Sequence, residues 1–249
     1  MAKKQNILVS FTPTQPELFE IKQWLLEENK NTRKGFYCNW NTINQGFLEG
    51  RVATISLDAK NVGFVLWSEW ECTARIEIME VHPQHRKKGI GKRLVTDLTT
   101  FFLQKGICVV DLQCNPASSE PIWRKLGFID FPSKEEGIDD EERVNKELYK
   151  VLIPHAEVTD LYNDADDVIQ LWDKEPYETK SIPPSWVWKI TFGNDNKELI
   201  LPIIHPCKSD WKIQRKCKSA IVADKVKRFA KDEIQFGRFL IINKPPDFQ

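Results

Sequence analysis

Apolar residues in the first 154 positions recur at two spacings, one typical of strands and one typical of helices. Five runs rich in β-branched and aromatic residues have the strand pattern, and the second is long enough to form a hairpin: 7–12, 52–67, 74–81, 107–114 and 146–153. Helical spacing extends from Pro16 to Glu28, from 90 to Gly106, and over a shorter run that ends at Gly127. Strands and helices therefore alternate, as in α/β proteins.

The strand predicted at 74–81 contains a phase shift. Ile76 and Ile78 have the spacing of one buried face, but position 80 is Glu and the next apolar residue is Val81. A slip of one residue between 78 and 81 is what a β-bulge produces. The alternative is that Glu80 points to solvent at the end of the strand.

The chain changes character after Pro154. Residues 157–178 are acidic, residues 208–231 are basic, and strand-like runs lie at 185–192, 198–204 and 237–243. We therefore predict two domains, 1–154 and a small α+β domain at 155–249. The basic run fits the solvated face of a helix with Ile221, Val222 and Val226 as its apolar stripe. Contact with nucleic acid is the alternative for this run.

Composition restricts the class of protein. The 249 residues are 41% apolar and 29% charged, with a formal net charge of zero, so overall charge favours neither nucleic acid nor a membrane surface. No run approaches the roughly 20 apolar residues of a membrane span, and the first residues lack a signal-peptide pattern. The six cysteines form no C-x-x-C pair, which favours reduced thiols in a cytoplasmic protein.

The stretch RKKGIGK at 86–92 joins a basic cluster, two glycines and a helix start. Unpaired N–H groups at a helix N-terminus attract anions, and glycines let a loop turn its own N–H groups inward. A P-loop would need Ser or Thr where Arg93 stands, and a dinucleotide-binding fingerprint would need Gly where Leu94 stands. The sequence therefore predicts a pyrophosphate site of another kind.

Two motifs in this order resemble a known family. The run V-x-P-x-x-R-x-x-G-x-G-x-x-L at 81–94 resembles motif A of the GNAT acetyltransferase superfamily, and NPASSEPIWRKLGF at 115–128 resembles its motif B. The resemblance covers about residues 5–154. It implies the GNAT fold, a mixed twisted sheet whose fourth and fifth strands splay apart, with acetyl-CoA in the gap and its pantetheine arm pairing like an added strand.

The resemblance also implies which residues bind the co-substrate. The pantetheine arm would lie along the backbone of the fourth strand, the pyrophosphate in the glycine loop, and further contacts would come from the start of motif B and from its helix. The implied set is Met79, Glu80, Val81, Arg86, Lys87, Lys88, Gly89, Ile90, Gly91, Lys92, Asn115 and Trp123.

An amine attacks a thioester only when it is neutral, so the chemistry needs a base. Glu77 stands where amine acetyltransferases of this family carry a base-side histidine, and Asp111 where the ribosomal-protein alanine acetyltransferases carry a glutamate. Each also fits a structural carboxylate. The resemblance makes the Val81 N–H the oxyanion donor. Trp123 replaces the family's tyrosine acid, and an indole is no acid at working pH.

These residues predict an enzyme that acetylates a primary amine of a small molecule, peptide or protein, as a monomer or homodimer. The alternative is a catalytically weak acyl-CoA-binding module that acts as a sensor or scaffold, which Trp123 favours. Nucleic acid and membrane are not expected partners. We expect no metal, because His82 with His85, and His205 with Cys207 and Cys217, lack the spacing of zinc ligands.

Overall fold

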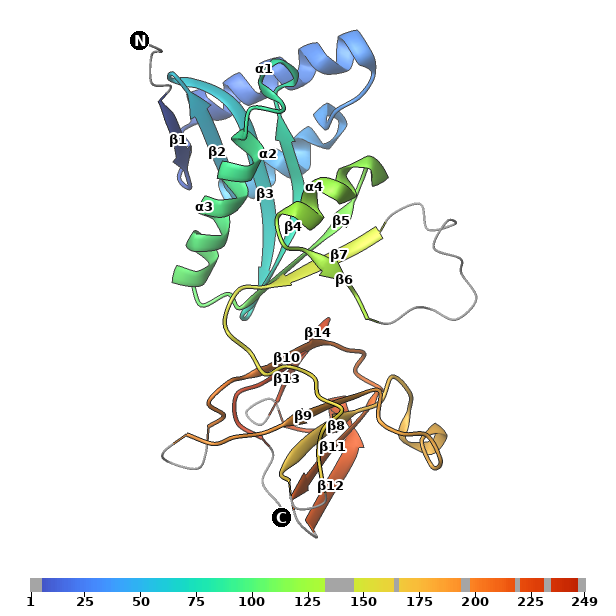
Figure 1. The fold of residues 1–249 in the computed structure, drawn as a ribbon. Coiled ribbons are helices and arrows are strands. Elements are labelled where there is room, and N and C mark those ends of the chain that lie inside the picture. The colour runs from blue at the N-terminus through green and yellow to red at the C-terminus, as the bar shows by residue number, and fades with distance from the viewer. Residues whose placement is uncertain are drawn as a thin grey trace. The chain divides into compact units, whose positions relative to one another are not determined.

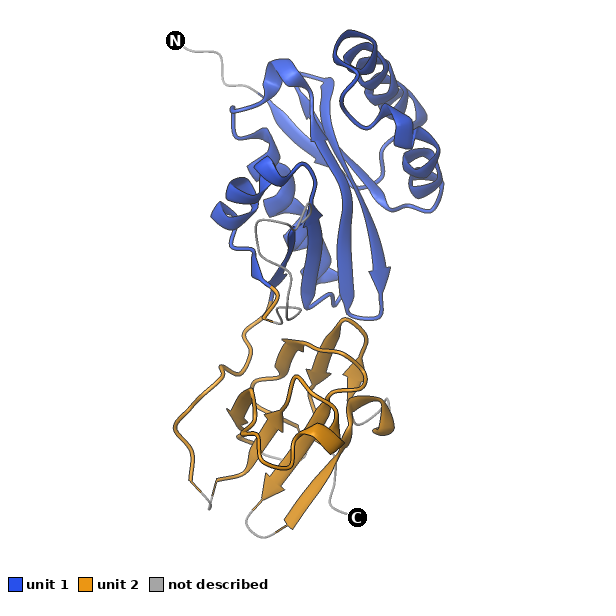
Figure 2. Cartoon of the chain, turned by 90° about the vertical axis from the view of Figure 1, so that its right-hand side faces the viewer, with its two compact units in different colours: residues 1–130, 137–152 blue, residues 131–136, 153–249 orange. Residues whose placement is uncertain are grey.

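The computed structural model describes residues 6–132, 146–163, 166–193, 198–217, 220–230 and 234–245 (Figure 1). The chain folds into two compact units, residues 1–130 with 137–152 and residues 131–136 with 153–249 (Figure 2). Most of the charged segment 133–147 lies outside the described residues. Among the described residues, no helix combines the length and apolar character needed to cross a bilayer.

The first unit is a seven-stranded mixed sheet with helices on both faces, in the strand order β1-β2-β3-β4-β5-β7-β6. The strands are β1 Ile7–Ser10, β2 Val52–Leu57, β3 Lys60–Trp70, β4 Thr73–Val81, β5 Val109–Cys114, β6 Ile129–Asp130 and β7 Lys146–Val151. The α-helices are α1 Gln15–Thr32, α2 Trp40–Leu48, α3 Ile90–Gln104 and α4 Glu120–Lys125. Short 3-10 helices are η1 Tyr37–Asn39, η2 Pro83–His85 and η3 Ala117–Ser119. The α/β prediction for this part of the chain is confirmed.

Local sequence explains where α1 begins and which face it buries. Thr14 caps the helix, and the Glu17 carboxylate accepts a hydrogen bond from the Thr14 N–H at 2.6 Å, which completes a capping box. Leu18, Ile21 and Leu25 recur at helical spacing and are fully buried against the sheet. Each such side chain contributes about 1.5–3 kcal/mol of hydrophobic stabilisation.

Two apolar cores lie on opposite faces of this sheet. One joins the strands to α3, through residues such as Leu94, Leu98 and Phe102, and the other joins them to α1 and α2. Because both faces are covered, the inner strands bury side chains in both directions. The strands that carry the candidate site are therefore packed on both faces.

The second unit is built from strands packed around its own apolar core. A four-stranded sheet has the order β12-β11-β8-β9 and a three-stranded sheet the order β10-β14-β13. The strands are β8 Val168–Leu171, β9 Trp186–Lys189, β10 Ile203–Pro206, β11 Lys212–Cys217, β12 Ala220–Lys225, β13 Gln235–Phe236 and β14 Phe239–Ile242. Short 3-10 helices are η4 Pro176–Glu178 and η5 Val226–Arg228.

This unit corrects two expectations. The α+β prediction is wrong in its helical part, since the described residues of this unit contain strands and 3-10 turns but no α-helix. The basic run predicted as a helix forms the antiparallel pair β11 and β12, in which Lys212 pairs with Lys225. Ile221 is 57% exposed on the edge strand β12, so it does not belong to an inward-facing stripe.

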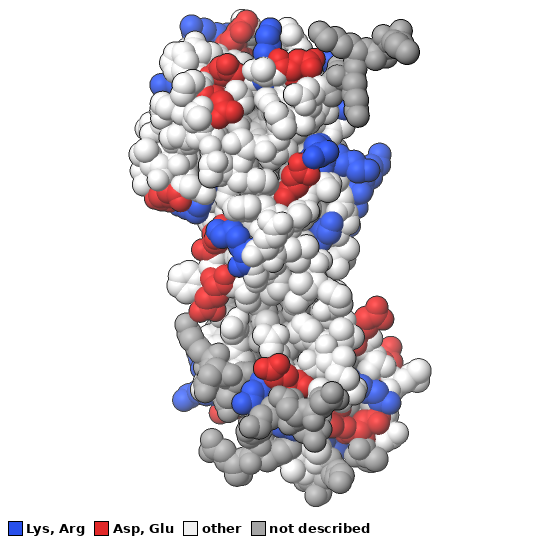
Figure 3. All heavy atoms as spheres, turned by 90° about the vertical axis from the view of Figure 1, so that its left-hand side faces the viewer, with Lys and Arg blue, Asp and Glu red and all other residues white. Residues whose placement is uncertain are grey.

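Charge is mixed over the surface that Figure 3 displays. On that face, lysine and arginine side chains alternate with aspartate and glutamate side chains over both units. Mixed charge does not form the continuous basic stripe that tracks a phosphate backbone. The described residues on the face shown in Figure 3 therefore form no continuous basic stripe.

A buried histidine makes the second unit sensitive to acid. His205 on β10 packs against Trp186 and Trp188 with ring centroids at 4.5 and 5.2 Å, and its Nε2 atom is buried with no hydrogen-bond partner among the described residues. Burial lowers the pKa of His205 to about 4, while an unfolded histidine titrates near ~6.5. Since only the unfolded chain gains this proton between those values, stability is complete above about pH 6.5 and falls as pH drops toward about 4.

We expect this fall to reach about 2–3 kcal/mol in the second unit. Denaturant unfolding between pH 7 and pH 4, with amide hydrogen exchange to assign the transition to residues 153–249, measures it. The control is His205→Gln, which removes the imidazole. An equally steep pH dependence in wild type and variant contradicts the assignment to His205.

Candidate functional site

The fourth and fifth strands of the first unit separate along their length. Strand β4 pairs with β5 in parallel only from Thr73↔Val109 to Ile76↔Leu112, although both strands continue. On its other side, β4 stays paired with β3 as far as Val81. The predicted splay is confirmed, and it leaves residues 77–81 facing a gap in the ladder.

A β-bulge lies at the point of separation, but not where the sequence predicted it. Ile76 pairs with Trp67 and Ile78 with Leu66, so Glu77 is the extra residue. The expectation of a slip between 78 and 81 is wrong. Ile76 belongs to the core under α3 and Ile78 to the core under α1, so these two side chains lie on opposite faces of the sheet.

Backbone direction beyond the bulge follows from one hydrogen bond. The His82 N–H donates to the Val62 carbonyl on the β3 side at 2.8 Å. In an antiparallel pair, the N–H and C=O groups of successive residues point to alternate sides of the strand. The N–H and C=O of Glu80 therefore also face β3, and those of Met79 and Val81 face the gap. A ligand in the gap would meet the Val81 N–H.

The glycine loop leads from this gap into α3. Lys87 and Gly89 adopt left-handed conformations with φ of 62° and 79°, and the helix begins at Ile90. The first helical hydrogen bond runs from the Arg93 N–H to the Gly89 carbonyl at 3.0 Å, so the N–H groups of 90–92 precede it. A Cβ at Gly89 would meet nothing within 4 Å, so the loop is open to an approaching anion.

Lysines surround this helix start. Lys87, Lys88 and Lys92 are exposed and lie within one turn of the first unpaired N–H groups. A Cβ at Gly91 would lie 3.1 Å from Cε of Met79, which places the start of α3 directly beside β4. The lysine side chains and the N-terminus of α3, which is the positive end of the helix dipole, therefore lie next to the gap.

Arg86, which the resemblance assigns to co-substrate binding, makes internal contacts. Its Nε donates to the Val81 carbonyl at 2.8 Å, and its Nη2 lies 2.9 Å from Oε1 of Glu28 and 2.7 Å from Oε1 of Glu80. Burial raises the pKa of Glu80 to about 7; Arg86 opposes the shift and Glu28 adds to it. Glu28 and Arg86 are 58 residues apart in the sequence, and no sequence pattern predicts their contact.

The two candidate bases lie on the face of the sheet opposite to α3. Arg75 bridges them, with guanidinium nitrogens 2.8 Å from Oδ2 of Asp111, 3.9 Å from Oε2 of Glu77 and 3.2 Å from Oε1 of Glu147. Glu77 also accepts a hydrogen bond from the Ser68 hydroxyl at 2.6 Å and is 40% exposed, whereas the Asp111 side chain is 4% exposed. Sequence reasoning missed Glu147, although it alternates with the buried Leu148 on β7.

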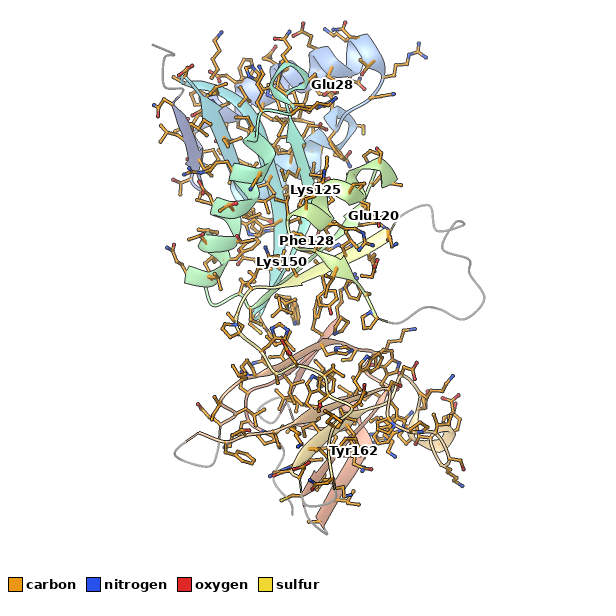
Figure 4. All side chains as sticks on the ribbon, viewed as in Figure 1. Glu28, Glu120, Lys125, Phe128, Lys150 and Tyr162 are labelled. Carbon is orange, nitrogen blue, oxygen red and sulfur yellow. The ribbon has the colours of Figure 1, made fainter. Side chains whose placement is uncertain are left out.

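The remaining predicted contacts lie along β5 and α4. Asn115 is exposed directly after β5. Trp123 on α4 is half-buried, and its ring meets Phe128 edge-on at 5.3 Å between centroids (Figure 4 labels Phe128). Among the described residues, no group of three or more His, Cys, Asp or Glu side chains is arranged to hold a metal ion.

Part of this chain is similar to known proteins. The sequence model of the acetyltransferase (GNAT) family matches residues 15–128. The PaiA N-acetyltransferase from Thermoplasma acidophilum, solved with coenzyme A, is 14% identical, covers 59% of this chain and 99% of its own, and has a TM-score of 0.47. An acetyltransferase of the GNAT family from Staphylococcus aureus is 16% identical, with coverages of 60% and 100% and a TM-score of 0.45. The ribosomal-protein alanine N-acetyltransferase from Escherichia coli is 14% identical, with coverages of 64% and 100% and a TM-score of 0.42. Comparison with curated proteins gives no match.

Proposed function

Because residues 15–128 match the sequence model of the GNAT acetyltransferase family, we propose that this chain transfers an acetyl group from acetyl-CoA to a primary amine by direct attack. The observation that carries the proposal is the gap between β4 and β5 next to the N-terminus of α3. We propose that residues 1–154 form the acetyl-CoA-binding domain, and we propose no role for the second domain, residues 155–249.

The residues present fit acetyl-CoA as a substrate. Its pyrophosphate would lie on the amides from Lys87 to Lys92, where the helix dipole and lysines favour negative charge. Its pantetheine arm would pair with the backbone of 79–81 that faces the gap. Asn115 and Trp123 would contact the arm from the β5 side. Arg86 would contribute to binding indirectly, because its hydrogen bond to the Val81 carbonyl holds the glycine loop against β4.

The chemistry follows from the same placement. The amine loses a proton, its nitrogen attacks the thioester carbon, the C–S bond breaks and the thiolate takes up a proton. The Val81 N–H would stabilise the oxyanion, and Glu77 or Asp111 would accept the amine's proton. Glu77 is the more accessible, while Arg75 already compensates the charge of Asp111. Since Trp123 is no acid, the thiolate would be protonated by water.

A second candidate function is an acyl-CoA-binding module with little turnover. The half-buried Trp123 favours it, because its ring packs on Phe128 where a tyrosine acid would otherwise stand. None of the six cysteines, all of which lie among the described residues, forms a disulfide, which supports a cytoplasmic location for either function. We propose a monomer or homodimer without metal.

We expect the protein to bind coenzyme A and to release free thiol from acetyl-CoA in the presence of an amine, with one acetylated amine per thiol. Calorimetry measures the first, and thiol titration with mass spectrometry of the amine measures the second. The Gln variant of Glu77 and the Asn variant of Asp111 separate the candidate bases, since loss of the true base lowers kcat at least about 100-fold and leaves coenzyme A binding unchanged.

The outcomes discriminate between the two functions. Coenzyme A binding without thiol release across primary amines favours the binding module. Absence of coenzyme A binding contradicts both. Unchanged kcat in Glu77→Gln and in Asp111→Asn removes both residues as bases while leaving the transfer reaction in place.

A further inference from the structure

We propose that Cys72 and Cys108 form a peroxide-reactive dithiol, a modification site at which the two thiols are oxidised to a reversible disulfide. The inference goes beyond the proposed acetyl transfer and does not depend on it. The site lies at the end of β4 and β5 where the two strands stay together, and residues 77–81, which face the gap, lie at the other end of β4.

Cys72 occupies the tight turn between β3 and β4. Trp70 pairs with Thr73, so Glu71 and Cys72 form a two-residue hairpin loop. Glu71 adopts a left-handed conformation with φ of 53°, as the first central residue of such a loop does. At this turn Cys72 is half-buried, so it stays partly accessible to a small solute.

Backbone hydrogen bonds hold Cys108 next to this turn. Its N–H donates to the Cys72 carbonyl at 2.8 Å, and its own carbonyl accepts from the Leu152 N–H at 2.8 Å. The residues that follow, Thr73 and Val109, are the first partners of the parallel ladder between β4 and β5. Cys72 and Cys108, which are 36 residues apart in the sequence, therefore continue the register of that ladder.

The two side chains contact each other. The thiols are hydrogen-bonded, and Sγ of Cys108 also lies 3.3 Å from the Cys72 carbonyl oxygen, to which it can donate. Neighbouring strands lie about 4.8 Å apart, and a disulfide needs Cα atoms about 4.4–6.8 Å apart. The pair can therefore close by rotation of side chains, without separation of the strands.

The two thiols differ in how readily they lose a proton. The hydrogen bond from Cys108 lowers the pKa of Cys72 to about 7, although burial and the Glu71 carboxylate act in the opposite direction. The same hydrogen bond, together with burial, raises the pKa of Cys108. Near pH 7, Cys72 is therefore the thiolate that attacks an oxidant, and Cys108 is the protonated thiol that resolves the product.

The oxidant is a peroxide. The Cys72 thiolate attacks one peroxide oxygen, the O–O bond breaks, and the products are a sulfenic acid and a hydroxide that takes up a proton. The Cys108 sulfur then attacks the Cys72 sulfur, the S–O bond breaks, and the leaving hydroxide takes the Cys108 proton to form water. Overall the thiols lose two electrons and two protons, and hydrogen peroxide is reduced to two water molecules. A dithiol reductant restores both thiols.

The experiment treats the reduced full chain with a small excess of hydrogen peroxide at pH 7 and identifies linked peptides by mass spectrometry without reduction. We expect the link between Cys72 and Cys108 as the main product. Because the link closes a loop of 36 residues, the Tm of the first unit should rise by about 10 °C. Dithiothreitol should reverse both changes.

Variants assign the roles of the two cysteines. Cys108→Ser should stop the oxidation at the Cys72 sulfenic acid, which dimedone labels, and Cys72→Ser should leave Cys108 as a thiol. Cys38→Ser is the matched control, because it removes an exposed thiol of η1 and should leave the link unchanged. Circular dichroism reports whether each variant is folded.

Several results would overturn the dithiol. Peroxide that leaves both thiols free, that oxidises them without joining them, or that joins either one mainly to another cysteine is such a result. A link that forms in the urea-unfolded chain but not in the folded chain is another, because the fold would then not bring the thiols together. Coenzyme A binding, measured on the same samples, tests the proposed function separately.

Discussion

Reversing two charges at the start of α3, in the double variant Lys88→Glu with Lys92→Glu, is expected to weaken coenzyme A binding about 1,000-fold. Both lysines are exposed beside the first N–H groups of the helix. Each would make a charge-assisted contact to phosphate, and losing two such contacts costs about 4 kcal/mol. The new glutamates would also place negative charge at the positive end of the helix dipole, where they would compete with the phosphates and repel them. Calorimetry at low ionic strength measures the change.

The matched control reverses two exposed lysines of the second unit, in Lys180→Glu with Lys208→Glu, and so changes the net charge equally. We expect that variant to bind coenzyme A within about threefold of wild type, because neither lysine belongs to the glycine loop or to the start of α3. Wild-type affinity should also fall with added salt. Comparable losses in the two double variants, or none in either, contradict a phosphate site at Lys87–Lys92.

The loop at 86–92 was predictable because its chemistry is local. The glycines, the helix start and the basic residues all lie within a few positions, and the structure places a left-handed Gly89 and the start of α3 at Ile90, as the sequence indicated. The splay of β4 and β5 was also predictable, but only through the resemblance of the two motifs. In both cases the signal lies in residues that are neighbours along the chain.

The position of the bulge was not predictable, for a physical reason. Ile76 and Ile78 look like one buried face, but helices cover both faces of the sheet, so both residues are buried even though a bulge places them on opposite sides. Hydropathy reports burial and does not report which face is buried. The error at Ile221 has a different cause, because the edge strand β12 carries an exposed apolar residue whose position mimics helical spacing.

Contacts between segments that are distant in the sequence could not be predicted either. Glu28 meets Arg86 and Glu147 meets Arg75, at separations of 58 and 72 residues. Neither Glu28 nor Glu147 has a distinctive pattern around it, and each resembles an ordinary surface charge in the sequence. These contacts matter because they decide which carboxylates near the site are already paired with an arginine.

The network around Arg75 leads to the second large effect. Arg75→Met is expected to destabilise the first unit by about 3–5 kcal/mol, because it removes the cation from Asp111, whose side chain is 4% exposed. The guanidinium lies 2.8 Å from Oδ2 of Asp111 and 3.2 Å from Oε1 of Glu147, so the two carboxylates lose their common counter-charge together. Denaturant unfolding at pH 7 measures the change, with amide hydrogen exchange to assign it to residues 6–130.

The double variant Arg75→Met with Asp111→Asn supplies the control. Asparagine keeps the shape and removes the buried charge, so most of the lost stability should return, and a double-mutant cycle should give a coupling of at least about 2 kcal/mol between the two positions. Additive effects would show that the ion pair contributes little and that Arg75 stabilises the strands by packing alone. In that case Asp111 would be less dependent on Arg75 and a stronger candidate for the base, which the kcat of Asp111→Asn would then decide.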